Sequence, residues 1–148
     1  MQSKQMLDEA PYYLKDFIMY METIKGKSEK TVDEYFFDLR TFLSYMKVLK
    51  GQAQIDDFDN ISIRDIPIEF IREITLHDLY EYLSYTLRER LNNANSRARK
   101  VSSLKSFFKY LLNKAKLIAF NPAAELDAPK KPKTLPKYLS LDESKKLL

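Results

Sequence analysis

Residues 96–116 read SRARKVSSLKSFFKYLLNKAK, and apolar side chains recur in this stretch at intervals of three and four residues. At about 100° of rotation per residue, one side of a helix collects the side chains of Val101, Leu104, Phe108, Leu112 and Ala115. The far side collects basic, hydroxyl and amide side chains, namely Arg99, Ser102, Ser106, Lys109 and Asn113, with Ser103 and Tyr110 beside them. The stretch therefore predicts a helix with one buried face and one basic, hydroxyl-rich face.

Three further amphipathic helices are expected earlier in the chain, over residues 11–25, 28–49 and 75–90. Gly26 stands where a glycine commonly ends a helix, and Ser28 can cap the helix that follows. Thr75 and Asp78 resemble a capping box with Asp in place of Glu. Only two glycines occur in 148 residues, which is too few for the tight turns of a strand-rich fold. The expected fold class is therefore all-α.

Residues 52–74 interrupt this helical pattern. The alternation of Ile61 and Ile63 favours a short strand, whereas the run 69–72 after Pro67 favours a helical turn. Both alternatives remain open on the pattern alone. We interpret this segment as an ordered insertion between the second and third helices.

The C-terminal part of the chain changes in composition. Asn121 and Pro122 predict one short turn over residues 123–127, which would close a first domain over residues 1–127. Residues 128–139 contain three prolines and four lysines, so we expect an extended linker there. Residues 140–148 are expected to open another amphipathic helix, which we interpret as the start of a truncated second domain.

Two aromatic stripes are expected to lie in the core rather than on a binding surface. They consist of Tyr12, Tyr13 and Phe17 in the first helix, and of Tyr35, Phe36 and Phe42 in the second. Phe37 lies off the second stripe, so its side chain is expected to be exposed.

The charge distribution is uneven along the chain. Residues 1–90 contain 12 Lys or Arg against 17 Asp or Glu, whereas residues 91–148 contain 13 against 4. Between Leu91 and Ala124 there are seven basic residues and no acidic one. Solvated helices usually mix both signs, so this asymmetry favours a polyanionic partner for the second half.

Several classes of protein are excluded by what the sequence lacks. The absence of Cys excludes disulfides, zinc-thiolate sites, iron–sulfur clusters and a thiol nucleophile. His77, the single histidine, is expected to be solvated or to have a capping role, and neither a metal nor a cofactor is expected. No stretch of 18 residues lacks a charge, and acidic residues stand where a signal peptide needs its apolar core. We therefore expect a cytoplasmic protein with no membrane partner.

Several segments resemble signatures of the tyrosine recombinase (phage integrase) family. Residues 28–43, SEKTVDEYFFDLRTFL, resemble S-x-x-T-x-x-x-Y-x-x-D-L-x-x-F, and residues 98–111, ARKVSSLKSFFKYL, resemble A-R-[RK]-[LV]-S-x-L-[RK]-x-F-[FY]-x-[YF]-L. Shorter matches follow in family order at Asn121-Pro122-Ala123, Pro129-Lys130 and Leu135-Pro136-Lys137-Tyr138-Leu139-Ser140. Over residues 11–148 the chain thus resembles the N-terminal core-binding domain of an Xer-like member of the family.

This resemblance implies a SAM-like four-helix domain, with the insertion 52–74 and a C-terminal linker, that clamps duplex DNA at a recombination site. The family's catalytic set is an Arg, a Lys, His-x-x-Arg, a second His or Trp, and a Tyr nucleophile in a following catalytic domain. His77 is not followed by Arg at the third place, so no catalytic residue is assigned and the chain is not expected to be an enzyme. We expect it to bind DNA as a monomer without cutting it. The full-length protein, with its own catalytic domain as partner, is expected to be a tetramer on DNA.

The resemblance also implies which residues contact DNA. The guanidinium of Arg99 can address guanine O6 and N7 together, whereas Lys105 and Lys109 act as point charges toward phosphate. The expected DNA-binding residues are Lys30, Thr31, Arg40, Arg99, Lys100, Ser102, Lys105, Ser106, Lys109, Lys131 and Lys133.

Asp33 and Glu34 depart from this pattern, because carboxylates repel phosphates. Either the second helix acts mainly through Lys30, Thr31 and Arg40, or Glu34 accepts a hydrogen bond from a cytosine amino group. We favour the first alternative. The rival function for the whole chain is a helical protein–protein interaction module whose basic face meets an acidic partner. A steep salt dependence would separate the two, since it is typical of phosphate neutralisation.

Overall fold

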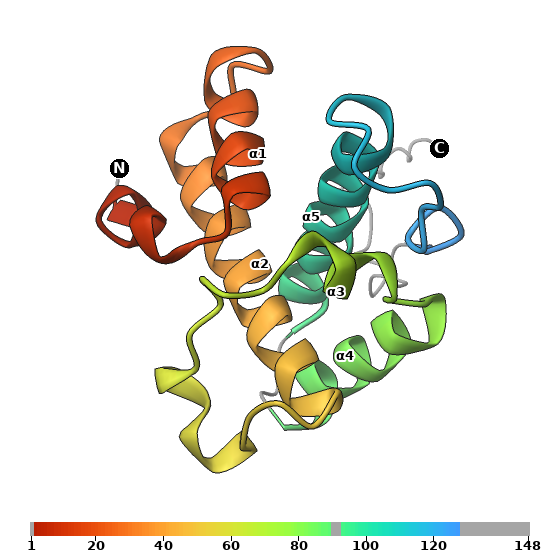
Figure 1. Cartoon of the computed structure of the whole chain (residues 1–148). Helices are drawn as coiled ribbons and strands as arrows, with labels where there is room; N and C mark the ends of the chain where they lie inside the picture. Colours follow the sequence, from red (N-terminus) through yellow and green to blue (C-terminus); the bar gives the residue numbers. More distant parts are fainter. Residues whose placement is uncertain (1, 90–92, 128–148) are drawn as a thin grey trace, which may run out of the picture.

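Four helices form the body of the molecule in the computed structural model, which describes residues 2–89 and 93–127 (Figure 1). They are α1 (Tyr12–Thr23), α2 (Glu29–Leu49), α4 (Leu76–Arg88) and α5 (Ala94–Asn113). A short helix α3 (Ile68–Arg72) and the 3₁₀ segments η1 (Gln2–Glu9) and η2 (Ile55–Asn60) complete the elements. No strand occurs in the two described ranges, and the all-α fold class is confirmed. The expected linker and final helix lie outside the described residues.

Short-range capping sets most of the helix starts. Ser28 Oγ accepts a hydrogen bond from the Thr31 backbone N–H at 3.2 Å. The capping box predicted at the start of α4 is confirmed, because the Thr75 and Asp78 side chains each accept the other's backbone N–H. Such caps satisfy N–H groups that have no partner within the helix.

The boundaries of α5 differ from the expected range 96–116. Asn93 Oδ1 accepts from the Ser96 backbone N–H at 2.8 Å, so the helix begins two residues earlier than expected. It ends three residues earlier, and Lys116 then adopts a left-handed backbone with φ +56°. Asn93 and Ser96 are both residue types that commonly cap helices, and in the structure Asn93 is the N-cap of α5.

The insertion contains a helical turn and no strand. Helix α3 confirms the alternative that placed a turn after Pro67, which stands at its N-cap position. The strand alternative is wrong, because Ile61 and Ile63 lie in irregular backbone without a partner strand. Tyr13 on α1 donates from its hydroxyl to the Ile66 carbonyl at 2.9 Å. This long-range bond anchors the insertion to the first helix.

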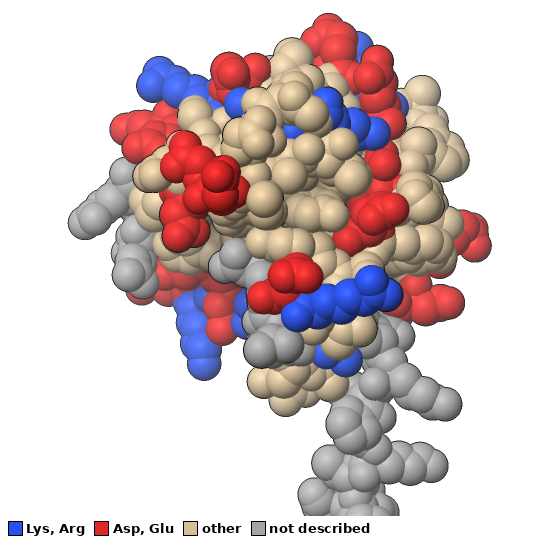
Figure 2. Space-filling view, turned by 90° about the horizontal axis from the view of Figure 1, so that it is seen from below, with Lys and Arg blue, Asp and Glu red and all other residues tan. Residues whose placement is uncertain are grey.

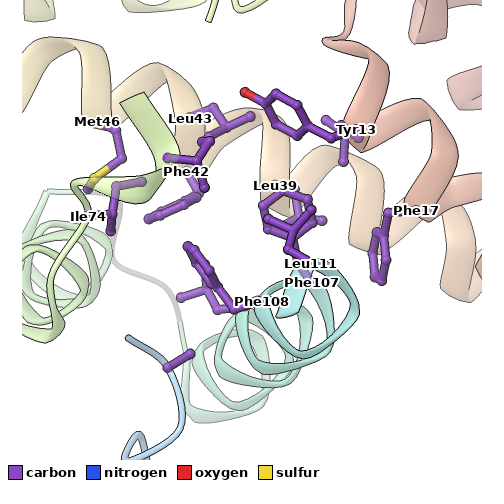
Figure 3. Close-up of a cluster of buried hydrophobic side chains, with 14 of the residues drawn as sticks. Tyr13, Phe17, Leu39, Phe42, Leu43, Met46, Ile74, Phe107, Phe108 and Leu111 are labelled. Atoms are coloured by element: carbon purple, nitrogen blue, oxygen red, sulfur yellow. The ribbon is translucent and has the colours of Figure 1, made fainter. Parts of the chain in front are cut away.

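Helix α2 is central, since it contacts α1, α4 and α5. Its buried side chains meet those of α1 and α5 in one apolar cluster, which Figure 3 shows in close-up. The largest fully buried members are Tyr13, Tyr82, Phe17, Phe36, Phe42, Phe107 and Phe108. Phe42 packs edge-on against Tyr82 and Phe108, with ring centroids 5.2 and 6.1 Å apart. Such aromatic contacts add to the burial of apolar area that stabilises the fold.

The buried face of α5 is rotated from the expected stripe. Val101, Leu104 and Phe108 are buried as predicted, whereas Leu112 and Ala115 are only partly buried. Residues Phe107 and Leu111 are fully buried in their place. The cause is α1, because Phe107 packs against Tyr13 and Phe17 on that side of the helix.

The aromatic stripes are confirmed except at their first members. Tyr12 is 54% exposed, because α1 begins with this residue at its outer face, and Tyr35 is half-buried. Phe37 is half-buried rather than exposed, and its ring packs edge-on against Phe36 with centroids 5.4 Å apart. His77 is exposed as expected, with Nε2 3.2 Å from Glu81 Oε2.

Candidate nucleic-acid interface

Asp38 is a buried carboxylate on α2 that faces the first turns of α5. Its side chain is 3% exposed and accepts from Arg99 Nε at 2.7 Å and from Arg99 Nη2 at 2.8 Å. Lys100 Nζ donates to the same carboxylate at 3.0 Å. A buried carboxylate needs such compensation, since burying an unpaired charge is costly. We call these three side chains the Asp38 cluster.

The Asp38 cluster turns two expected DNA contacts inward. Arg99 was expected on the outward face, but its fork is held by Asp38, and the remaining Nη1 lies 3.8 Å from Glu34 Oε2. Hydrogen bonding to Asp38 raises the pKa of Arg99, against the opposing effect of burial. Lys100 is buried, which corrects its expected place on a DNA-facing surface. Both differences follow from a carboxylate more than 60 positions away in sequence.

A hollow beside the Asp38 cluster is rich in carboxylates. It is lined by Glu29, Lys30, Asp33, Glu34, Phe37 and Arg99, and we call it the acidic hollow. Lys30 is exposed at its edge, and Thr31 is half-buried next to the cap of α2. Arg40 is half-buried farther along the same helix. Three carboxylates against two cations make this a poor surface for a phosphate backbone.

The outward face of α5 lies toward its C-terminal half. Ser102, Lys105 and Lys109 are exposed there, and Ser106 is half-buried between them. Lys105 Nζ donates to the Leu126 carbonyl at 2.7 Å, so this lysine also ties α5 to the turn that follows. Ser103, expected beside this face, is buried, and its hydroxyl donates to the Lys100 carbonyl at 2.9 Å.

Two further hollows lie on either side of Ser106 and Lys109, and both residues line each of them. The aromatic groove is lined by Phe17, Tyr20, Met21, Lys25, Lys27, Tyr35, Ser106, Lys109, Tyr110, Asn113 and Lys114. The turn hollow is lined by Lys105, Ser106, Lys109, Asn121, Ala123 and Ala124. Neither lining contains a carboxylate. A basic surface without acids therefore lies on both sides of Ser106 and Lys109 in the second half of α5.

The turn hollow owes its shape to the predicted turn at Asn121. The Asn121 side chain accepts from the Ala123 backbone N–H at 2.8 Å, and its carbonyl accepts from Ala124 N–H at 3.2 Å. This bent backbone brings residues 121–124 against Lys105 and Lys109. The expected turn after Asn121 is thus present, but it covers residues 122–125 rather than 123–127.

Sequence reasoning missed the three lysines Lys25, Lys27 and Lys114. They flank the ends of two helices, and Figure 1 shows the loop after α1 and the end of α5 at the same upper end of the molecule. The Gly26 residue between Lys25 and Lys27 adopts φ +61° and reverses the chain. The only feature of the sequence that could have indicated Lys25 and Lys27 is their position on each side of Gly26, the glycine that ends a helix.

The other end of the molecule has a different surface. Figure 2 views it from below, where η2 and α4 lie, and acidic side chains gather there around a largely uncharged centre. Basic side chains on this face are scattered. The face seen in Figure 2 therefore lacks the acid-free basic surface that lines the two hollows beside Ser106 and Lys109.

Two other kinds of site are absent from the described residues. No helix in ranges 2–89 and 93–127 has the length and apolar character needed to cross a bilayer. No group of three or more His, Cys, Asp or Glu side chains in those ranges is arranged to hold a metal ion.

Comparison with known proteins places the helical fold in a family. The profile of the family "Phage integrase, N-terminal SAM-like domain" matches residues 63–115, which include α3, α4 and α5. The chain therefore carries a phage integrase N-terminal SAM-like domain.

Its curated relatives are tyrosine recombinases. The XerC of Caldanaerobacter subterraneus subsp. tengcongensis is 45% identical over 139 residues, which are 93% of this chain and 39% of that protein. The XerC of Anoxybacillus flavithermus is 36% identical over 80 residues, or 54% of this chain and 26% of the relative. The XerD of Rhizobium meliloti is 37% identical over 78 residues, or 53% and 24%. The chain thus spans about two fifths or less of these relatives, and no solved structure matches it significantly.

Proposed function

We propose that this domain binds duplex DNA through the outward face of α5, as the DNA-binding part of a site-specific tyrosine recombinase. The observation that carries the proposal is the pair of acid-free hollows on either side of Ser106 and Lys109. Exposed lysines neutralise phosphates, and the small side chains of Ser102 and Ser106 let the helix backbone approach a groove closely. The relatives named as tyrosine recombinases support the same class of partner.

The Asp38 cluster has a positioning role in this proposal. Arg99 and Lys100 hold α5 against α2 through one carboxylate, which fixes the direction in which the lysines of α5 point. Base reading by Arg99 would need the guanidinium to leave Asp38 or to act through Nη1 alone. We therefore assign DNA contact mainly to Ser102, Lys105, Ser106 and Lys109.

Helix α2 contributes at its edge. Lys30 is exposed beside the acidic hollow, so it can reach a phosphate, while Thr31 and Arg40 would add weaker contacts. Lys131 and Lys133, which lie outside the described residues, are proposed as further phosphate contacts. The cytosine contact of Glu34 is disfavoured, because this carboxylate already lies near Arg99.

The parent activity proposed here is DNA strand breakage and rejoining through a phosphotyrosine. A catalytic domain outside residues 1–127 would supply the chemistry, while this domain would grip one side of the duplex. We propose that the fragment is monomeric alone and that the full-length protein acts as a tetramer on DNA.

Duplex binding at two salt concentrations tests the proposal. The variant Lys109→Gln should weaken binding and lower the slope of log K against log salt by about one. Arg64→Gln is the matched control, because Arg64 is an exposed cation in the insertion and its replacement removes the same charge. Equal behaviour of both variants would contradict the assignment to α5. A flat salt response of the unchanged protein would favour the protein interaction module instead.

A further inference from the structure

The aromatic groove is a recess lined by aromatic rings, a feature that binding to the phosphates of a duplex does not require. It lies between the C-terminal part of α1, the start of α2 and the second half of α5, and it holds about 520 Å³. This volume is within the range of sites that enclose a small molecule. A flat array of lysines would neutralise phosphates equally well without such a recess.

Tyrosine rings form one wall of the groove. The Tyr110 ring lies with its centroid 5.0 Å from that of Tyr20 and 5.5 Å from that of Phe17. Tyr20, Tyr35 and Tyr110 are half-buried, so each keeps part of its ring in contact with solvent at the groove. Contacts among the rings fix their orientation, which reduces the entropy lost when a planar ligand stacks on them.

Four lysines from three segments of the chain line the groove beside these rings. Lys25 and Lys27 come from the loop after α1, Lys109 from α5 and Lys114 from its C-cap. No hydrogen bond or ion pair to these four ammonium groups occurs within residues 2–89 and 93–127. Burial raises the pKa of Tyr110, with smaller contributions from the Asp16 carboxylate and Tyr20, but Asp16 does not line the groove. The recess therefore has an aromatic wall and an uncompensated positive rim.

We propose that the aromatic groove binds an unpaired nucleotide, with its base against the tyrosine rings and its phosphate among the four lysines. Base stacking on aromatic side chains together with a basic track is how proteins hold single-stranded nucleic acid. A base inside a duplex cannot use this site, because both of its faces are covered by neighbouring bases. The site shares Ser106 and Lys109 with the duplex contacts proposed for the outward face of α5, but its tyrosine rings and Lys25, Lys27 and Lys114 lie outside those contacts.

Fluorescence anisotropy with two labelled probes tests the site. The first is a thymidine oligonucleotide of about eight residues, and the second is a duplex. We expect Tyr20→Leu to weaken oligonucleotide binding roughly tenfold, because one stacking contact is lost, while duplex binding changes less than about twofold. We expect Lys27→Gln combined with Lys114→Gln to lower the salt dependence of oligonucleotide binding only. The control Lys105→Gln should do the reverse, since Lys105 lines the turn hollow and not the aromatic groove.

Tyrosine fluorescence of the unchanged protein gives a readout that does not depend on any variant. The chain has ten Tyr and no Trp, so quenching by an added base, after correction for the base's own absorption, reports stacking on tyrosine. Thymidine triphosphate identifies the source of the ligand. Quenching by the free nucleotide supports a site for single nucleotides, and quenching by the oligonucleotide alone supports a site for a strand.

Two results would overturn the proposal. One is the absence of both quenching and oligonucleotide binding by the unchanged protein. The other is an equal loss of duplex and oligonucleotide binding in the Lys27 and Lys114 double variant, which would make these lysines part of the duplex surface. Failure of duplex binding with retained oligonucleotide binding would instead contradict only the proposed function of the α5 face.

Discussion

Asp38 of α2 and Arg99 of α5 are 61 positions apart in the sequence and form a two-point ion pair, with N···O distances of 2.7 and 2.8 Å. The pair joins the two helices at the point where their N-terminal halves meet, and Lys100 adds a third bond to the same carboxylate. The consequence is that the orientation of α5, and with it the direction of its lysines, depends on one buried acid.

Asp38→Asn should therefore destabilise the domain by about 3 kcal/mol, because it leaves the buried Lys100 ammonium without its counter-charge. Urea unfolding followed by circular dichroism measures the loss. Lys100→Met should cost less, since Asp38 keeps both bonds to Arg99. Glu69→Gln, in an exposed pair with Arg72 at 3.8 Å, serves as the surface control and should stay within about 0.5 kcal/mol. A cost for Asp38→Asn no larger than that of the control would contradict the role assigned to the cluster.

Acid should weaken the cap of α4 through Asp78. Burial raises the pKa of this carboxyl, but the Lys50 ammonium and the Thr75 backbone N–H outweigh burial, and the pKa is lowered from its ordinary value of 3.8. A lowered pKa in the folded state contributes stability above about pH 4, and this stability is lost as the pH falls through the folded-state pKa. Asp78→Asn should be less stable at neutral pH and should lose stability less steeply in acid. Unfolding midpoints measured from about pH 6 to pH 2 check this, and curves parallel to that of the unchanged protein would refute it.

The start of α5 depends on one side chain. Replacing Asn93 by Ala removes the hydrogen bond to Ser96 N–H and should cost about 1 kcal/mol in unfolding free energy. Asn95→Ala, an exposed change inside the same helix, should leave stability unchanged or raise it slightly, because Ala is the better helix former. If both changes had the same effect, Asn93 would not be the cap.

Gly26→Ala tests the backbone of the loop that carries Lys25 and Lys27. A Cβ at Gly26 would meet no atom within 4 Å, so the expected cost of about 1 kcal/mol comes only from the left-handed φ of +61°. Gly26→Asn should cost less, because Asn tolerates this conformation better than Ala. Thermal unfolding of the two variants measures the difference. A larger cost for Asn than for Ala would show that space, and not φ, decides.

Local signals were enough to predict much of the fold. Ser28 and the Thr75–Asp78 pair act over three residues, so their caps can be recognised in the sequence and are confirmed. The alternation of Ile61 and Ile63 suggested a strand that the structure does not contain. A strand needs a partner strand, and the local pattern does not reveal whether one is present. The burial of Phe107 and Leu111 likewise depends on the position of α1.

The candidate site was less predictable for the same reason. Arg99 and Lys100 belong to a basic helix face by spacing, but Asp38 on another helix captures both of them. Lys105 and Lys109 were named from the sequence and line the turn hollow. The aromatic groove needed Tyr20, Tyr35 and Tyr110 from three helices, an assembly that only tertiary packing creates.

The burial of Asp38 separates two responses to ionic strength. Dissolved ions screen exposed charges strongly and buried pairs much less. Rising salt should therefore release a polyanion from the lysines on the flanks of α5 while the join between α2 and α5 keeps its strength. A salt titration would then give two curves. The curve for the binding constant would be steep, and the curve for the melting temperature would be nearly level. The domain could be washed off its partner by salt and recovered fully folded.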